Sequence, residues 1–239
     1  MDNPGYVTLS RQAALMKDMR IVANNIANLS TTGFRREGAV FSEMLEKGGV
    51  LGGAAAQTDA NVRVTDFSQG ALRRTGADLD LAIEGDGFFM VETPDGPGLT
   101  RAGAFVVSRA GELVNADGRR VLDEGAAAIA IPPDAGHIGV ASDGTISVDG
   151  QPIGKIGVAR VEDPSTLVRN EAGIFTTDQP LVPAEGATVH QGFVESSNVD
   201  PIREIARMIE VQRAYELGQS FLETEDERIR AAIRTLGAA

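Results

Sequence analysis

The chain has 239 residues, a formal net charge of −12 and no cysteine, and 42% of its residues are hydrophobic. This length suits one large domain or two small ones, and the absence of thiols excludes disulfides, thiolate metal sites and cysteine nucleophiles. The acidic balance argues against nucleic-acid binding by phosphate neutralisation, and no apolar run approaches the roughly 18–20 residues that span a bilayer.

A first helix is predicted near the N-terminus, with Thr8 or Ser10 as its cap and an end near residues 28–30. Apolar side chains recur there at spacings of three and four, which predicts one packed face interrupted only by Gln12. The apolar members are Leu9, Met16, Met19, Ala23 and Ile26. Gly33 then suits a left-handed turn. Residues 1–20 show no signal-peptide pattern, so we expect export, if it occurs, by another route.

Residues 39–60 are predicted to be a flexible or extended connector, because four glycines and four alanines fall within 46–60. From residue 61 to 194 the hydrophobic pattern changes to a period of two, as in Leu79, Leu81 and Ile83, which predicts β-strands. Asp-Gly pairs, which favour tight hairpin turns, recur through this region at Asp86-Gly87, Asp95-Gly96, Asp117-Gly118, Asp143-Gly144 and Asp149-Gly150.

A long last helix is predicted from Pro201 to Leu236, with Asp200 as its N-cap and Glu204 adding negative charge to the first turn. Heptad core positions fall at Met208, Val211, Tyr215, Leu222, Ile229, Ala232 and Leu236, with Gly218 and Glu225 as weak points. An adjacent stripe comprises Ile202, Ile205 and Ile209. This apolar face is too wide for one partner helix, so we expect the first helix to cover part of it and other subunits the rest.

The acidic excess lies between the two predicted helices. The first 37 residues carry five basic and three acidic side chains, and the last 42 carry six and eight, which leaves 11 basic and 23 acidic residues in 38–197. The plain interpretation is a solvated surface. The sharper one is that the middle faces water while the near-neutral ends face each other.

Catalytic and metal-binding patterns are not found in the sequence. His137 and His190 lie far apart without metal-like spacing, and the phosphate-loop, dinucleotide, nucleophile-elbow and zinc-helix motifs are absent. We therefore predict no enzyme activity and no cofactor. Three asparagines, Asn24, Asn25 and Asn28, are unusual at a helix end. They fit two interpretations equally, local capping or hydrogen bonds across a helix–helix contact.

Several segments of the sequence resemble motifs of the bacterial flagellar rod and hook protein family. The segment Ala23-Asn-Asn-Ile-Ala-Asn28, followed by Ser30-Thr-Thr-Gly-Phe-Arg-Arg36, resembles its N-terminal motif. Residues 79–89 and 100–105 resemble its middle β-domain, and residues 197–199 and 208–213 resemble its C-terminal helix. The resemblance implies a structural axial subunit of the basal-body rod. The subunit would assemble through its terminal helices into a tube that transmits torque and conducts exported proteins.

This resemblance implies a periplasmic rod location, delivery by the flagellar export apparatus without a cleaved signal, and other rod proteins or copies of the chain as partners. No nucleic acid and no membrane span are expected. The short length and opening residues are most similar to proximal-rod members of the family. The distal rod is the alternative position, and a soluble β-domain binding module is the alternative of another class.

The expected fold is α+β, with the terminal helices packed as a coiled-coil-like pair and a central all-β domain forming a small barrel or sandwich. We expect residues 1–38 to form the first helix and motif loop, 39–60 the connector, 61–194 the β-domain and 195–239 the last helix. The candidates for subunit packing are Leu9, Met16, Met19, Asn24, Asn25, Ile26, Asn28, Phe34, Ile202, Ile205, Met208, Ile209, Val211, Tyr215, Leu222, Ile229 and Leu236.

Overall fold

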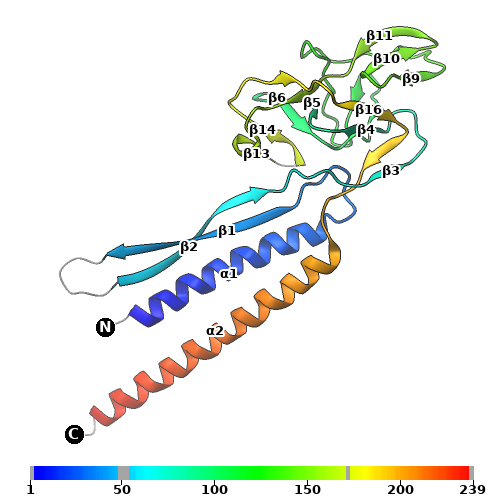
Figure 1. Cartoon of the computed structure of the whole chain (residues 1–239). Coiled ribbons are helices and arrows are strands. Elements are labelled where there is room, and N and C mark those ends of the chain that lie inside the picture. Colours follow the sequence, from blue (N-terminus) through cyan, green and yellow to red (C-terminus); the bar gives the residue numbers. More distant parts are fainter. Residues whose placement is uncertain (1–2, 48–53, 171–172, 237–239) are drawn as a thin grey trace. The chain divides into compact units, whose positions relative to one another are not determined.

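The computed structural model describes residues 3–47, 54–170 and 173–236, and the chain divides into two compact units (Figure 1). The first unit contains helix α1 (Asn3–Ala27), strands β1 (Glu37–Lys47) and β2 (Ala54–Thr65), and helix α2 (Pro201–Leu236). The second contains the loop 28–36 and residues 67–199. The fold is thus α+β, with one N-terminal helix, a β-rich middle and a C-terminal helix, as the sequence predicts.

Helix α2 has the predicted bounds, Pro201–Leu236. The Asp200 carboxylate accepts hydrogen bonds from the backbone N–H groups of Ile202 at 2.9 Å and Arg203 at 3.2 Å. Two N–H groups that the helix leaves without internal partners are thereby satisfied. Pro201, which has no N–H to lose, fits the first helical position. The predicted cap of α2 is confirmed.

Helix α1 begins at Asn3, earlier than the predicted caps at Thr8 and Ser10. Proline is tolerated in a first helical turn, so Pro4 does not delay the start. The helix ends at Ala27, next to the predicted end, and Gly33 has the expected left-handed φ of +68°. A Cβ at Gly33 would lie 2.3 Å from the backbone nitrogen of Ala102 within the second unit, so both the turn and the close approach require glycine.

Strands β1 and β2 occupy most of the segment predicted to be a connector. They pair antiparallel from Glu37 opposite Thr65 to Lys47 opposite Ala54, with a register shift between Val40 and Ser42. Residues 48–53, the most glycine-rich part of the predicted connector, lie outside the described residues. Helix α1 packs along this hairpin and also against α2 (Figure 1). The low complexity of the segment concealed its strands, because its alanines and glycines carry little β-propensity.

The second unit is built from short strands in several small sheets. The largest has the order β13-β14-β6-β5-β12-β15, a second has the order β11-β10-β9, and β16-β4, β17-β3 and β7-β8 form antiparallel pairs. The strand bounds are β3 (Leu72–Arg74), β4 (Leu81–Glu84), β5 (Phe88–Thr93), β6 (Gly96–Thr100), β7 (Val106–Val107), β8 (Leu113–Val114), β9 (Ile138–Val140), β10 (Thr145–Val148), β11 (Gln151–Lys155), β12 (Val158–Arg160), β13 (Val168–Arg169), β14 (Phe175–Thr176), β15 (Val182–Pro183), β16 (Thr188–Gln191) and β17 (Phe193–Glu195), with a 3₁₀ turn at Pro164–Thr166.

Two hydrophobic clusters form the core of the second unit. Leu81 and Ile83, predicted to point inward, are fully buried in the larger cluster together with Phe89. Leu99 and Phe175 belong to the smaller one. The period-two pattern therefore placed the inward face of β4 correctly.

The Asp-Gly pairs form turns of different kinds. Asp149 and Gly150 both have positive φ, +49° and +82°, between the paired residues Val148 and Gln151, which makes a two-residue hairpin of the predicted type. Thr93 pairs with Gly96, so the β5–β6 turn is centred one residue earlier than predicted. Asp86-Gly87 joins β4 to β5, which pair with other strands rather than with each other.

Candidate functional site

The contact between α1 and α2 is polar along much of its length. Gln12, Asp18 and Asn25 of α1 are buried, and each bonds to α2. Gln12 meets Tyr215 near the N-terminal end of α1 and Asn25 meets Glu204 near its C-terminal end, so the two helices run antiparallel. The three polar contacts of α1 therefore follow one another along the axis of the helix pair, and each is called a level below.

Asn25 makes the contact nearest the C-terminal end of α1. Its amide Nδ2 donates to the Glu37 carbonyl at 2.8 Å and to Glu204 Oε2 at 3.1 Å, and its Oδ1 accepts from the Glu37 N–H at 3.0 Å. Asn25 and Glu204 are both fully buried. Glu204 lies in the first turn of α2, where the partial positive charge of the helix N-terminus stabilises a carboxylate. One asparagine side chain thus joins α1, α2 and β1.

The other two levels use different chemistry. Asp18 is buried and receives a hydrogen bond at 2.8 Å from Arg207, whose side chain is half exposed. Gln12 Nε2 donates to the Tyr215 carbonyl at 2.9 Å. A Cβ at Gly218 would lie 2.1 Å from that same Nε2 atom, so glycine makes room for the Gln12 side chain over α2. Gly218 is therefore the point where the Gln12 side chain crosses α2.

The inner face of α2 follows the predicted heptad. Met208, Tyr215 and Leu222 are half buried and Val211 is only 2% exposed. Their spacing of three and four continues backward to Glu204 and through Gly218. Two of the three polar contacts of α1 reach α2 at members of this series, Glu204 and Tyr215, and the third reaches Arg207 beside Met208, so this is the face that α1 covers.

Only part of the predicted stripe of α1 faces away from its buried residues, because Gln12 within that stripe is buried and Met19 and Ile26 are half buried. Leu9 is 60% exposed and Met16 is 40% exposed, whereas Ala14, Ile21 and Val22 are buried. The periodicity gave an apolar stripe, but it did not show which stripe faces the partner. The reason is that α1 packs against both α2 and the β-hairpin, and it meets α2 through polar residues.

Helix α2 extends beyond α1. Helix α1 begins nine residues before Gln12, so its first turn comes opposite roughly residue 224 of α2. The heptad face of α2 continues past this point through Ile229 and Leu236, which are exposed. Residues 225–236 of α2 are called the overhang. Among the described residues of the first unit, α1 does not reach far enough along α2 to cover the apolar side chains of the overhang.

A second apolar surface of α2 lies near its start. Ile202, Ile205 and Ile209 are exposed, on a face turned away from Glu204 and Val211. Three further exposed apolar side chains of α2 were not among the predicted packing residues; they are Leu217, Phe221 and Ile233. Leu217 and Phe221 are four residues apart, a spacing on one side of the helix that the heptad template did not capture.

The remaining candidates have local or internal partners. Met19, Ile26 and Asn28 are half buried and Asn24 is exposed. Asn28 Oδ1 accepts from the Thr31 hydroxyl at 3.1 Å, which is the local capping interpretation, whereas Asn25 follows the helix–helix interpretation. Phe34 is buried in the second unit beneath the Arg169 guanidinium, 4.5 Å from its ring centroid. The Phe34 ring therefore contributes to the core of its own chain.

The motif loop, residues 28–36, is held to the rest of the second unit by a buried ion triad; this second unit is called the β-rich unit below. Both Arg35 and Arg101 bond to the carboxylate of Glu195, Arg101 at 3.1 Å, and the Gly70 N–H donates to Glu195 Oε1 at 2.7 Å. The side chains of Arg35 and Glu195 are completely buried and that of Arg101 is 4% exposed. Burial lowers the pKa of Arg101 from its ordinary value, an effect that the nearby Glu195 carboxylate opposes.

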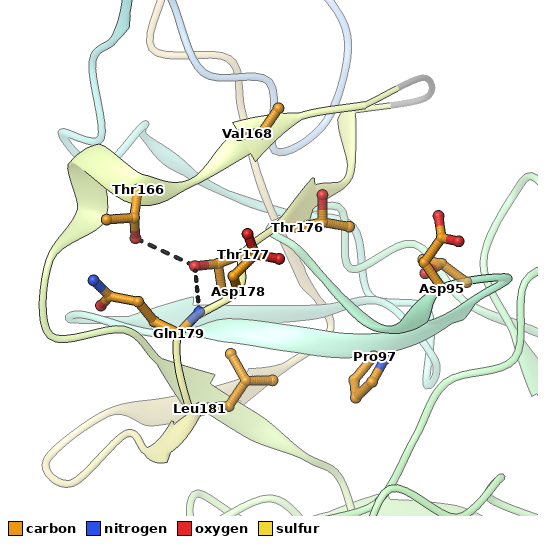
Figure 2. A pocket seen from close by; sticks show the side chains of 10 residues that line it. Asp95, Pro97, Thr166, Val168, Thr176, Thr177, Asp178, Gln179 and Leu181 are labelled. Atoms are coloured by element: carbon orange, nitrogen blue, oxygen red, sulfur yellow. Dashed lines mark hydrogen bonds between the residues drawn. The ribbon is translucent and has the colours of Figure 1, made fainter.

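A polar pocket of about 450 Å³ lies in the second unit (Figure 2). The hydroxyls of Thr166 and Thr177 lie 3.2 Å apart, and the Gln179 N–H donates to Thr177 Oγ1 at 3.1 Å. None of the described residues that line this pocket is aromatic, and an aromatic lining is the feature that would favour a carbohydrate or peptide binder. Its lining residues are Thr93, Asp95, Pro97, Thr166, Val168, Thr176, Thr177, Asp178, Gln179 and Leu181.

Neither a metal cluster nor a membrane-spanning helix occurs among the described residues. Within residues 3–47, 54–170 and 173–236, no group of three histidine, aspartate or glutamate side chains is arranged to hold a metal ion. No helix in the same ranges is long and apolar enough to cross a membrane.

Comparison with known proteins gives consistent matches along the chain. Residues 6–35 match the family model "Flagella basal body rod protein", residues 82–148 match "Flagellar hook protein FlgE/F/G D1 domain", and residues 190–235 match "Flagellar basal body rod FlgEFG protein C-terminal". These ranges contain the N-terminal motif, most of the β-domain motif and the C-terminal helix identified from the sequence.

Curated relatives match over almost the full length. The flagellar basal-body rod protein FlgF of Caulobacter vibrioides is 40% identical, and the alignment covers 99% of both chains. FlgF of Mesorhizobium japonicum is 35% identical over 100% of this chain and 99% of its own. The flagellar basal-body rod protein FlgG of Bacillus subtilis is 31% identical over 95% and 97%.

Proposed function

We propose, from the premise that this chain belongs to the flagellar basal-body rod protein family, that it is a subunit of the proximal rod. The family is one of structural rod proteins and not of enzymes, and the chain is a structural component of the basal body. In this role it would form part of a tube that transmits torque and conducts exported proteins.

The observation that best supports assembly is the apolar surface that the single chain leaves exposed on α2. Ile233 in the overhang is 63% exposed and Leu236 is 81% exposed, although they continue the face that α1 covers earlier. Burying one such side chain contributes about 1.5–3 kcal/mol. Helices of neighbouring rod subunits are the partners that would cover this seam, and Ile202, Ile205 and Ile209 offer a second contact on another side.

The proximal position rests on finer arguments. Relatives named FlgF reach 35–40% identity, and those named FlgG reach 31–33%. The short length and opening residues also resemble proximal-rod members. A distal-rod subunit is the alternative, and the two positions differ in where the chain lies along the rod.

Three further properties come with the family and belong to the same proposal. The chain assembles with other rod proteins and with copies of itself. The flagellar export apparatus delivers it without cleavage of a signal peptide. The assembled rod that contains it crosses the periplasm.

The finer features of the predicted fold also belong to this proposal. In the assembled rod, α1 and α2 form a coiled-coil-like pair, which is supported by the three-and-four spacing of Met208, Val211, Tyr215 and Leu222. The β-rich unit closes as a small barrel or sandwich, which is supported by its many short strands. A density map of an assembled rod would decide both features.

A charge placed on the exposed apolar surface tests assembly directly. Ile209→Asp and Ile233→Asp should each abolish incorporation into basal bodies and motility, because a carboxylate would be buried in the subunit contact. Gln219→Asp is the matched control, since Gln219 is also an exposed residue of α2. Both purified isoleucine variants should keep the wild-type unfolding midpoint. Normal rods built from both of them would disprove this packing role.

Immunogold labelling of purified basal bodies tests the position. An antibody against residues 61–194 should label the rod near the inner-membrane ring. Label near the outer rings would move the chain to the distal rod. No label on intact, accessible basal bodies would contradict the axial role and favour the soluble binding module instead.

A further inference from the structure

Two amide side chains hold α1 against α2 at well-separated levels. Gln12 and Asn25 lie 13 residues apart on α1, which is about 20 Å along a helix. Their contacts on α2 are the Tyr215 carbonyl and the Glu204 carboxylate. Two directional contacts this far apart define both the axial position and the rotation of one helix relative to the other.

The Asn25 contact tolerates little displacement. Both the carbonyl and the amino group of its side chain are hydrogen-bonded, to the backbone of Glu37 and to Glu204, and no part of the residue reaches solvent. A rotation or one-residue slide of α1 would leave these buried groups without partners, and water could not replace them at that depth. Each buried polar group that loses its partner lowers the population of the displaced arrangement by about tenfold.

The Gln12 contact restricts the axial position in a different way. Its side chain crosses α2 at Gly218, where any Cβ would meet Nε2 at 2.1 Å. A slide by one residue would bring Gln12 opposite Leu217 or Gln219, both of which carry side chains. The gap at Gly218 therefore favours the observed register over a slide in either direction.

An alternative pairing of the same helices would otherwise compete. Leu9 and Met16 form an exposed apolar stripe on α1, and Ile202, Ile205 and Ile209 form one on α2. Apolar attraction has no directional preference, so by itself it would favour turning these stripes toward each other within the chain. In the observed pair Asn25 is buried against α2, Gln12 reaches α2 from the edge of the Leu9–Met16 stripe, and the apolar stripes of both helices stay exposed.

We propose that Asn25 and Gln12 are specificity-determining residues that select the register and rotation of α1 on α2, and so keep the apolar stripes of both helices on the outside. A single buried asparagine in a coiled coil fixes register by the same physics, at some cost in stability. The selected pairing is a property of the single chain, so it stands or falls separately from the position proposed in the rod.

Spin-label distances measure the register directly. The chain has no cysteine, so Arg20→Cys and Arg213→Cys, both at exposed helix positions, accept a pair of nitroxide labels without other changes. Double electron–electron resonance is recorded on the labelled full-length chain and on the same chain carrying Asn25→Leu, Gln12→Leu or both. Ala23→Leu and Arg11→Leu are matched controls, because each is an exposed position on the same helix near one of the two amides.

The expected result is one narrow distance for the labelled parent and for both controls. The double variant should keep its helical circular dichroism signal but gain a second distance, with about a tenfold or greater rise in the alternative population. An unchanged single distance in the double variant would overturn the proposal. It would also be overturned if the double variant lost its helical signal, since the amides would then only stabilise the helices, or if the controls shifted equally.

Discussion

Removing the charge of Glu195 tests the buried ion triad of the β-rich unit. Its carboxylate receives hydrogen bonds from Arg35, Arg101 and the Gly70 N–H, and all three side chains of the triad are almost inaccessible to solvent. Glu195→Gln keeps the shape but leaves two buried guanidinium groups facing a neutral amide. The glutamine side chain has one acceptor oxygen, whereas both oxygens of the Glu195 carboxylate accept hydrogen bonds.

The expected loss of stability is about 3–5 kcal/mol, which is the usual effect of removing one partner from a buried ion pair. For a chain of this size each kcal/mol lowers Tm by about 2–4 °C, so the midpoint of the β-rich unit should fall by roughly 6–20 °C. Differential scanning calorimetry of the full chain is the assay, because it resolves the unfolding of two units separately if they are not cooperative.

The matched control is Glu92→Gln. Glu92 binds Arg120 through two hydrogen bonds at 2.5 and 2.8 Å, but both side chains are more than two-fifths exposed. Water screens this pair, so its loss should leave the midpoint close to that of the parent. A Glu195→Gln midpoint no lower than that of the control would refute the reasoning about burial.

Three further changes have clear expected outcomes. Gly33→Ala should destabilise the chain by roughly 2–5 kcal/mol in calorimetry, because the residue has a left-handed φ and its Cβ would meet Ala102. Asp200→Ala should cost about 1 kcal/mol in urea denaturation followed by circular dichroism, because α2 loses its cap. The His137 N–H holds the pKa of Asp149 below its ordinary 3.8. The ionised Asp149 carboxylate therefore stabilises the fold at pH values above its ordinary pKa of 3.8. The stability difference between wild type and Asp149→Asn should shrink as the pH falls below about 4.

The sequence predicted well those elements whose signals are local. Asp200 and Pro201 mark the start of α2, and its inner face follows a heptad around Val211. The alternation through Leu81 and Ile83 gave the inward face of a strand. In each case the pattern and the structure it specifies lie within a few residues of each other.

Features that depend on distant partners were harder to predict. Helix α1 has polar and apolar stripes, and its periodicity did not show that Asp18 and Asn25 would be buried while Leu9 stays exposed. That choice depends on Glu204, 179 residues away from Asn25. The β1–β2 hairpin was missed because its composition resembles that of a linker. Its packing against α1 depends on residues distant in the sequence, which local patterns do not show.

The order of segments in the first unit has a consequence for when it can fold. Its parts are residues 1–27, 37–66 and 200–239, so the chain runs through the whole β-rich unit before α2 exists. At a synthesis rate of about 5–20 residues per second, Asn25 waits on the order of ten seconds for Glu204. A nascent chain that has not yet reached residue 204 therefore has no helix pair, and the surfaces that α1 and α2 present together cannot form before α2 is made.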